Sequence, residues 1–528
     1  MKKLFTFVLM AALAVGTAMA NWQPSDTEAT PLDKEGTQGQ VQMKTIRTDD
    51  GKIILSWLRP ERVNDKFSYV LHLQIFDANG NAMFGDEGII VCDKPTRSWT
   101  TDYALDLAPN GDIILGYNDS RNDPESTETT EVYLYRYTQQ GEPVWDADGV
   151  LFPSWPIAEF EAYPEDVNPV ICVSGDNIYA AVARSEYSNG YNTKWELVRL
   201  NQDGTPAPTV TKTFSSRIVV LKPAPEGMVY CLYDNPELGL DAELLDEDLV
   251  NNWNDPITVE PRQISNGRYM PTPLTALDAD GNLFISYRVL ESFTGYQVVN
   301  HLTPEGEFFA EAPSCNNSID GDAGTAAMGV KDDLAFVAWE YDFGNYFMNV
   351  SEIDAAGDYC WPDDRMYGVA IDENDMWGFT PVKVIPQEDG WVLLYGNSTS
   401  WNGANFMVVK MDEIGNVVWT KQICEKNFKS SGFSIAYDEN YAYIFYTQEE
   451  QYDNNWNVIP GSGGMFVMCV DIVGDKPSAV QEVQTAAQPV STQIFTLDGK
   501  QVSEMDHGVY IIRMTDANGN VTSTKVRK

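Results

Sequence analysis

The chain has 528 residues, of which 43% are hydrophobic and 12% aromatic, a composition that excludes an intrinsically disordered protein. With 78 acidic and 35 basic residues its formal net charge is −43, and such a surface repels phosphate backbones, so we expect no nucleic-acid partner. After the N-terminal region, no stretch has the roughly 18 apolar residues that a membrane-spanning helix needs.

The first 20 residues have the parts of a secretory signal peptide. Lys2 and Lys3 precede an apolar run over 4–15, and Ala18-Met19-Ala20 forms a small-residue cleavage site. The alternative is a buried N-terminal helix, but such a helix would not explain the small-residue pattern of a cleavage site. No cysteine follows that site, so we expect an exported chain without a lipid anchor, in which residues 21–37 form an N-terminal extension.

A turn followed by a β-rich apolar run recurs along the middle of the chain. Two clear copies are Asp50-Gly51 before Ile53–Trp57 and Asn110-Gly111 before Ile113–Tyr117. The second turn position falls at 51, 111, 175, 227, 281, 333, 390 and 440. Eight copies at a period of about 55 residues indicate a repeat architecture.

A second turn follows the first in most copies, and an aromatic residue often stands four places after its glycine: Phe84, Trp145, Trp361 and Trp419. The fourth copy has Asp246-Glu247-Asp248 in place of a glycine turn, followed by Trp253. Gly, Asn and Asp tolerate the positive φ that a tight hairpin requires, so each turn predicts a hairpin between strands.

Four antiparallel strands per repeat, with no helical period, are typical of a propeller blade. A single blade cannot bury both of its faces, so the blades must surround a common axis. The sequence therefore predicts an all-β fold with an eight-bladed β-propeller over residues 38–475. A seven-bladed ring is the main alternative, and two stacked sandwich domains are the third.

The amino-acid composition changes after Pro477. Residues 476–493 are rich in Gln, Ala and Thr and predict a linker, and residues 494–528 predict a small β-rich domain. This segment resembles the type A C-terminal sorting domain of the type IX secretion system of Bacteroidota. The matching positions are Gly499, Lys500, Gly508, Tyr510, Arg513, Lys525 and Lys528. The resemblance implies contact with the type IX secretion machinery and delivery to the outer surface or the medium. A hairpin module that only docks on the propeller is the alternative.

The residues that usually carry metal or cofactor chemistry are sparse. The seven cysteines form no C-x-x-C pair, and the three histidines (His72, His301 and His507) have no metal-ligand spacing, so we expect neither a metal nor a cofactor. Buried free thiols are the expected state of most cysteines, although one or two disulfides are possible in an exported protein.

Polar and aromatic residues follow the second strand of each repeat. In a propeller these loops gather on one face, where aromatic rings and planar polar groups suit sugars or peptides. The predicted binding residues are Arg59, Asn118, Arg121, Arg184, Arg288, Trp401 and Trp456. The simpler reading of any one of them is that loop ends are polar because they are hydrated.

Two functions remain open from the sequence. The first is a non-catalytic binding or adhesion module for a glycan or protein ligand, with no second subunit expected. The second is a glycoside hydrolase or lyase with a central cleft, whose candidate acids are Asp119, Asp234 and Glu340. No complete catalytic motif favours the second function.

Overall fold

The computed structural model describes the propeller region and most of the C-terminal domain. The described residues are 22, 24–25, 28–32, 41–473 without 64–65, 97–101, 123–130, 153–168, 186–192, 202–205, 238, 265–272, 292–293, 316–321, 343–344, 363–367, 375–377, 401–402, 424–427 and 449–463, and 491–527 without 497–499, 503–508 and 516–520. The predicted signal peptide lies outside them. The chain divides into two compact units, Met1–Ile472 and Val473–Lys528.

The first unit consists of eight consecutive blades, which we number 1 to 8. Six of them are separate four-stranded antiparallel sheets, whereas blades 5 and 6 are joined into one seven-stranded sheet by a single parallel pair, Gly295 and Asp322. Blades 1 and 2 contain β2 (Val41–Arg47), β3 (Ile53–Val63), β4 (Lys66–Phe76) and β5 (Ile89–Cys92), then β6 (Tyr103–Leu107), β7 (Ile113–Asp119), β8 (Glu131–Tyr137) and β9 (Val150–Phe152). Blades 3 and 4 contain β10 (Val170–Ser174), β11 (Asn177–Ser185), β12 (Thr193–Leu200) and β13 (Pro206–Phe214), then β14 (Ile218–Pro223), β15 (Val229–Asp234), β16 (Leu240–Leu245) and β17 (Ile257–Glu260).

The remaining blades follow the same order along the chain. Blades 5 and 6 contain β18 (Leu274–Leu277), β19 (Leu283–Glu291) and β20 (Thr294–Leu302), then β21 (Asp322–Lys331), β22 (Leu334–Asp342), β23 (Tyr346–Asp354) and β24 (Val369–Asn374). Blades 7 and 8 contain β25 (Phe379–Gln387), β26 (Gly390–Ser400), β27 (Gly403–Met411) and β28 (Val417–Ile423), then β29 (Phe428–Tyr437), β30 (Tyr441–Gln448), β31 (Gly464–Asp471) and β1 (Thr30–Pro31).

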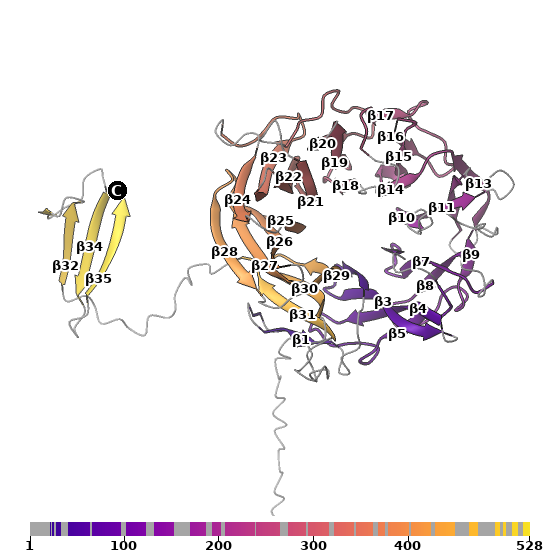
Figure 1. Ribbon diagram of the computed structural model, residues 1–528, viewed down its shortest axis with the longest axis horizontal. Helices are drawn as coiled ribbons and strands as arrows, with labels where there is room; N and C mark the ends of the chain where they lie inside the picture. The colour runs from indigo at the N-terminus through magenta and orange to yellow at the C-terminus, as the bar shows by residue number, and fades with distance from the viewer. Residues whose placement is uncertain are drawn as a thin grey trace, which may run out of the picture. The chain divides into compact units, whose positions relative to one another are not determined.

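The blades follow one another around a ring (Figure 1), with the first strand of each blade innermost. Inner strands of neighbouring blades contact each other, as β6 contacts β10 and β29 contacts β2. The prediction of an eight-bladed propeller is confirmed, and the seven-bladed alternative is wrong. In blade 5 one isolated bridge, Val298 to Ser314, stands in place of a regular fourth strand.

The ring is closed by the N-terminal segment. Thr30 and Pro31 pair with Val467 and Phe466 at the outer edge of β31, and the backbone N–H groups of Ser25 and Leu32 donate to carbonyl groups of the same strand. The predicted boundary at residue 38 therefore leaves out the strand that completes blade 8. The sequence repeat gives no sign of this strand, because it and its partner β31 stand at opposite ends of the propeller sequence.

Both predicted turn series are hairpins at one end of the blades. In the second series the first residue is often Asp, and its carboxylate accepts the backbone N–H groups two and four residues later, as Asp77 does from Asn79 and Asn81 at 2.9 Å. Asp246 forms the same bonds in the degenerate fourth copy, where Leu249 occupies the glycine position with φ 58°. Side-chain bonding to the backbone thus keeps the turn even without glycine.

The aromatic residues after these turns join each blade to the next. A Cβ built on Gly141 of blade 2 would lie 2.9 Å from the ring of Phe84 of blade 1, and one on Gly415 of blade 7 would lie 2.8 Å from Trp361 of blade 6. Trp22 of the N-terminal segment makes the corresponding contact with Gly80 of blade 1, at 2.8 Å. Trp22 therefore supplies to the seam of blades 8 and 1 the aromatic ring that a preceding blade supplies elsewhere.

The hydrophobic core lies in the seams between blades. Clusters of buried Val, Ile, Leu and aromatic side chains join blades 1 and 2, 3 and 4, 4 and 5, 6 and 7, and 7 and 8. Trp339, Trp391 and Tyr117 are among the largest fully buried side chains. The second strand of blade 2 is buried along its whole length, as expected for a strand packed on both faces.

The second unit is a four-stranded sheet with the order β33 (Gln501–Val502), β32 (Ser491–Thr496), β34 (Val509–Thr515) and β35 (Val521–Arg527). Tyr510 lies opposite Thr496 and Val526, and Lys525 lies opposite Ile511. Lys500 and Arg513 are exposed, while Gly499, Gly508 and Lys528 lie outside the described residues. Across the described part of the chain, no helix has the length and apolar character to cross a membrane.

Candidate functional site

Arg59, Arg184 and Arg288 lie within the second strands of blades 1, 3 and 5. Asn118 and Asp119 end β7, and Arg121 follows them directly. Trp401 and Trp456 lie outside the described residues, and of Arg184 only the backbone, on β11, is described. Of the predicted set, the structure brings Asn118, Asp119 and Arg121 together in one polar network at the seam of blades 1 and 2.

Asp119 and Arg121 form the centre of this network. Arg121 Nε donates to Asp119 Oδ1 at 2.9 Å and Nη2 donates to Oδ2 at 2.6 Å, while the Arg121 backbone N–H reaches Oδ1 at 3.0 Å. The Asp119 side chain is fully buried, and 15% of the Arg121 side chain is exposed. A two-point ion pair of this kind is strong and fixes the guanidinium plane.

Blade 1 contributes to the network through the end of its outer strand. Cys92 Sγ donates to Asp119 Oδ2 at 3.5 Å, and burial, followed by the Asp119 charge, raises the pKa of Cys92 to about 12. The Thr96 hydroxyl donates to the Asn118 carbonyl at 2.9 Å, and the Ser120 N–H donates to the Pro95 carbonyl at 2.7 Å. The link between blades 1 and 2 is thus bonded to the end of β7.

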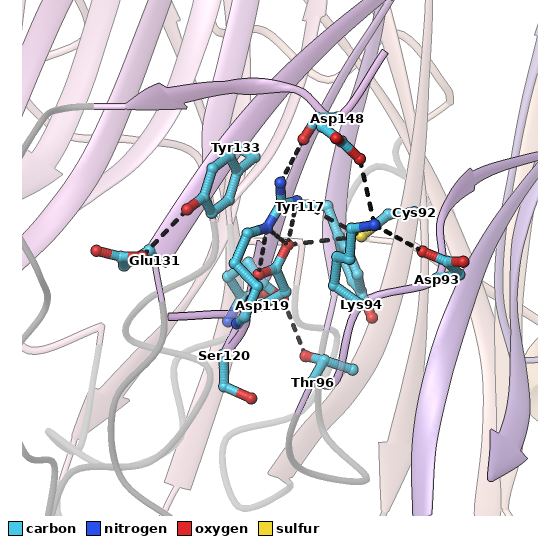
Figure 2. A network of polar contacts seen from close by, with 12 residues as sticks. Cys92, Asp93, Lys94, Thr96, Tyr117, Asp119, Ser120, Glu131, Tyr133 and Asp148 are labelled. Atoms are coloured by element: carbon cyan, nitrogen blue, oxygen red, sulfur yellow. Dashed lines mark hydrogen bonds and ion pairs between the residues drawn. The ribbon is translucent and has the colours of Figure 1, made fainter. Parts of the chain in front are cut away.

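Tyrosines of β8 cover the guanidinium group. The Arg121 guanidinium carbon lies 3.5 Å from the centre of the Tyr133 ring, and Nη2 donates to the Tyr135 hydroxyl at 2.8 Å. The Tyr133 hydroxyl donates to Glu131 at 3.1 Å (Figure 2). It also accepts from the Asn122 amide at 3.0 Å. Because Glu131 and Asp119 each accept several bonds, both acids have a structural role here.

The outward side of the same network is charged and exposed. Lys94 forms ion pairs with Asp93 and Asp148 at 3.2 Å each, and Figure 2 shows these three side chains on one side of Asp119. The side chains of Asp93 and Asp148 are 63% and 74% exposed. Such exposed pairs contribute little to stability, which leaves them able to exchange partners with a ligand.

A second acid–arginine pair occurs at the seam of blades 4 and 5. Arg262 Nε and Nη2 donate to the two oxygens of buried Glu260, both at 2.9 Å, and Tyr287 of blade 5 donates to the same carboxylate at 3.3 Å. This pair was not predicted from the sequence, although Glu260-Pro261-Arg262 has the same acid-to-arginine spacing as Asp119-Ser120-Arg121.

The other predicted residues lie apart from the network. Arg59 pairs with Glu61 and Glu87 of its own blade, and half-buried Arg288 lies opposite Gln297 in blade 5. The other two candidate acids, Asp234 and Glu340, belong to blades 4 and 6, and Glu340 accepts the Phe379 N–H of blade 7 at 2.7 Å. The three candidate acids therefore lie on three different blades: 2, 4 and 6.

The described histidines and cysteines are mostly buried within the fold. Burial, with a smaller contribution from Arg59, lowers the pKa of His72 to about 4, and burial also lowers the pKa of His301. The six described cysteines are free, and all except Cys360 are buried. Within the described residues, no group of three or more His, Cys, Asp or Glu side chains is placed to hold a metal ion. His507 and Cys424 lie outside those residues.

No protein-family model matches the chain, and no curated protein matches it either. Solved structures with a similar chain path include a protein of unknown function from Dyadobacter fermentans, which is 9% identical with a TM-score of 0.39, over 84% of this chain and 98% of that one. A puromycin hydrolase is 12% identical with a TM-score of 0.37, over 81% and 62%. The polysaccharide lyase Uly1 is 11% identical with a TM-score of 0.33, over 68% and 89%. This chain therefore spans less than two thirds of the puromycin hydrolase.

Proposed function

We propose that this chain is an exported, non-catalytic binding protein that recognises a glycan or protein ligand with the propeller face carrying the blade 1–blade 2 network. The observation that carries the proposal is the state of Asp119. Its carboxylate is fully buried and accepts five bonds, from Nε and Nη2 of the Arg121 side chain, the Arg121 backbone N–H and Cys92. A carboxylate that is fully buried and held in this way is not accessible to a substrate.

The outer rim of the network supports a binding role. Lys94, Asp148 and Asn122 present charged and amide groups over a base that the tyrosines and the ion pair make rigid. Rigid positioning lowers the entropic cost of binding, and planar polar groups beside aromatic rings suit sugars and peptides. The large excess of acid over base on the chain favours a ligand that is neutral or cationic.

The test is a combined binding and hydrolysis screen of the full chain against polysaccharides and surface proteins. Binding without turnover is expected. Lys94→Ala and Asn122→Ala should weaken binding by about tenfold, while Gln140→Ala, at an exposed hairpin turn at the other end of blade 2, should leave binding unchanged. Catalytic turnover that is lost in Asp234→Asn or Glu340→Gln would instead support the carbohydrate-active enzyme.

The export route is the second part of the proposal. We assign residues 476–528 as a sorting segment for the type IX machinery, because the motif positions Tyr510, Arg513 and Lys525 lie on paired strands of a separate unit. A reporter carrying a signal peptide and this segment should reach the surface or medium of a host with that machinery. Retention of the reporter in the periplasm would contradict the assignment.

A further inference from the structure

A cavity of about 310 Å³ lies where the N-terminal segment meets blades 1 and 8. Its wall combines the N-terminal segment (Trp22, Pro24), the two hairpin turns of blade 1 (Gly51, Ile53, Asp77, Ala78, Asn79, Gly80) and blade 8 (Tyr441, Tyr443, Cys469). This volume is at the lower end of the range for small-molecule sites. The cavity lies beside the hairpin turns, at the opposite end of blade 1 from the blade 1–blade 2 network.

Aromatic rings make up much of the wall. The ring centres of Trp22 and Tyr443 are 5.8 Å apart with a tilt of 54°, and those of Tyr443 and Tyr441 are 6.5 Å apart with a tilt of 56°. Trp22 also packs against Phe445 with an interplanar angle of 83°. These contacts hold the three rings in fixed positions, so the cavity is formed before any ligand enters.

The polar groups of the wall divide into bonded and available ones. The Asp77 carboxylate accepts from the backbone of Asn79 and from both nitrogens of Asn81, and the Tyr443 hydroxyl donates to Asp438. Within the described residues, neither the Trp22 indole N–H nor the Tyr441 hydroxyl has a hydrogen-bond partner. The cavity therefore offers one donor and one group that can donate or accept.

The composition of the wall selects the class of ligand. It contains no Lys, Arg or His and carries the negative charge of Asp77, which disfavours an anion. A purely apolar ligand would leave the indole N–H and the phenol hydroxyl without partners. A ligand with several hydroxyl groups around a ring satisfies both the polar groups and the aromatic surface.

We propose that this seam cavity binds one neutral sugar unit through Trp22 and Tyr441, and that the bound sugar stabilises closure of the propeller ring. The coupling arises because Trp22 and Pro24 belong to the segment that completes blade 8. A ligand that binds only when this segment is in place stabilises the closed ring by mass action. The site is independent of the function proposed above.

The experiment measures binding of glucose, galactose, mannose and N-acetylglucosamine to the full chain by calorimetry, together with the thermal unfolding midpoint. At least one sugar should bind and raise the midpoint. Tyr441→Phe keeps the ring and removes the hydroxyl, so it should weaken binding about three- to tenfold. The matched control is Tyr346→Phe, a half-buried tyrosine of β23 outside the cavity, which should bind as the unmodified chain does.

A second readout follows the N-terminal segment itself. Limited proteolysis should cut between residues 21 and 40 more slowly in the presence of the sugar that binds. The proposal is overturned if none of the four sugars binds, if Tyr441→Phe and Tyr346→Phe bind equally well, or if protection is absent while binding occurs. Binding of tetramethylammonium in place of the sugars would also overturn it and would indicate a cation site lined by aromatic rings.

Discussion

At the scale of single residues, polar groups at the blade seams bond to other protein groups rather than to solvent. The sequence placed Asn118, Asp119 and Arg121 at one strand end but could not show that Asp119 is buried, because its partner Cys92 comes from another blade. The sequence shows the spacing of Glu260 and Arg262 but does not show that Glu260 is buried. Burial of a charge is decided by distant contacts, which a local pattern of residue types does not contain.

His72 gives a pH-dependent prediction at this scale. Its pKa is lowered from 6.5 to about 4, so the unfolded chain binds a proton in this range while the folded chain does not. The contribution of His72 to stability is therefore complete above pH 6.5 and is lost as the pH falls towards 4. One pKa unit corresponds to about 1.4 kcal/mol, so the loss can reach about 3 kcal/mol.

The measurement is urea unfolding of the unmodified chain and His72→Phe at pH 7 and pH 4.5. The phenyl ring can stack on Trp57, as the imidazole does at 5.1 Å, but it cannot be protonated. The unmodified chain should lose about 2 kcal/mol more than the variant between the two pH values. The carboxyl groups titrate in both proteins, so their contributions to the loss of unfolding free energy cancel in the comparison. Equal losses would show that His72 is protonated in the folded state.

Asp119 gives the second prediction. Asp119→Asn removes the charge that pairs with Arg121 and leaves the guanidinium group half-enclosed, so the free energy of unfolding should fall by about 3 kcal/mol. Adding Arg121→Met should recover part of this loss, because no unpaired charge remains. Urea unfolding of the two single variants and the double variant measures the coupling. Additive losses would mean that the ion pair does not contribute as a unit.

At the scale of elements, the hairpins were the predictable part of the fold. Turn chemistry is local, so Asp77 to Gly80 and its counterparts could be read directly from the chain, and even the degenerate copy at Asp246 forms the expected turn. The fourth strand of blade 2 is short, with β9 covering only Val150–Phe152. Outer strands lie at a sheet edge and make fewer backbone bonds, so their sequence is less constrained.

The contact between an aromatic ring and the glycine of the next turn gives the third prediction. Gly80 and Gly85 have φ values of 77° and 75°, so alanine costs each about 1 to 2 kcal/mol in backbone strain. A Cβ at Gly80 would lie 2.8 Å from the Trp22 ring, whereas one at Gly85 has no atom within 4 Å. Gly80→Ala should therefore lower the free energy of unfolding by a further 1 to 3 kcal/mol or so. If Gly80→Ala and Gly85→Ala lowered the free energy of unfolding equally in chemical unfolding, the Trp22 ring would move aside without a free-energy cost.

At the scale of the whole molecule, the number of blades followed from the repeat, but the way the ring closes did not. The eight turns at a period of about 55 residues indicated eight sheets around one axis. The closing strand β1 has two residues, and a segment that short carries no periodicity of its own. Its place is set by Trp22 and by the unpaired edge of β31, which only the assembled ring presents.

Closure gives the fourth prediction. A chain that begins at residue 33 lacks β1 and Trp22, so it exposes the edge of β31 and the apolar surface of Phe76 and Phe445. Loss of one buried tryptophan costs about 3 to 5 kcal/mol, which for a domain of this size lowers the unfolding midpoint by about 3 to 5 °C. The exposed edge should also promote self-association, visible as concentration-dependent mass in light scattering.

The matched control for this truncation is a chain that ends at residue 472. The C-terminal unit has its own sheet, with β32 paired to β33 and β34, so its removal leaves every described strand pair of the propeller in place. We expect the propeller to unfold at the same temperature with or without that unit, whereas the N-terminal truncation unfolds earlier. If the two truncations lowered the midpoint equally, the ring would not depend on the N-terminal strand in particular. If the N-terminal truncation had no effect, blades 1 and 8 would hold together through β2 and β29, the inner strands that contact each other across the same seam.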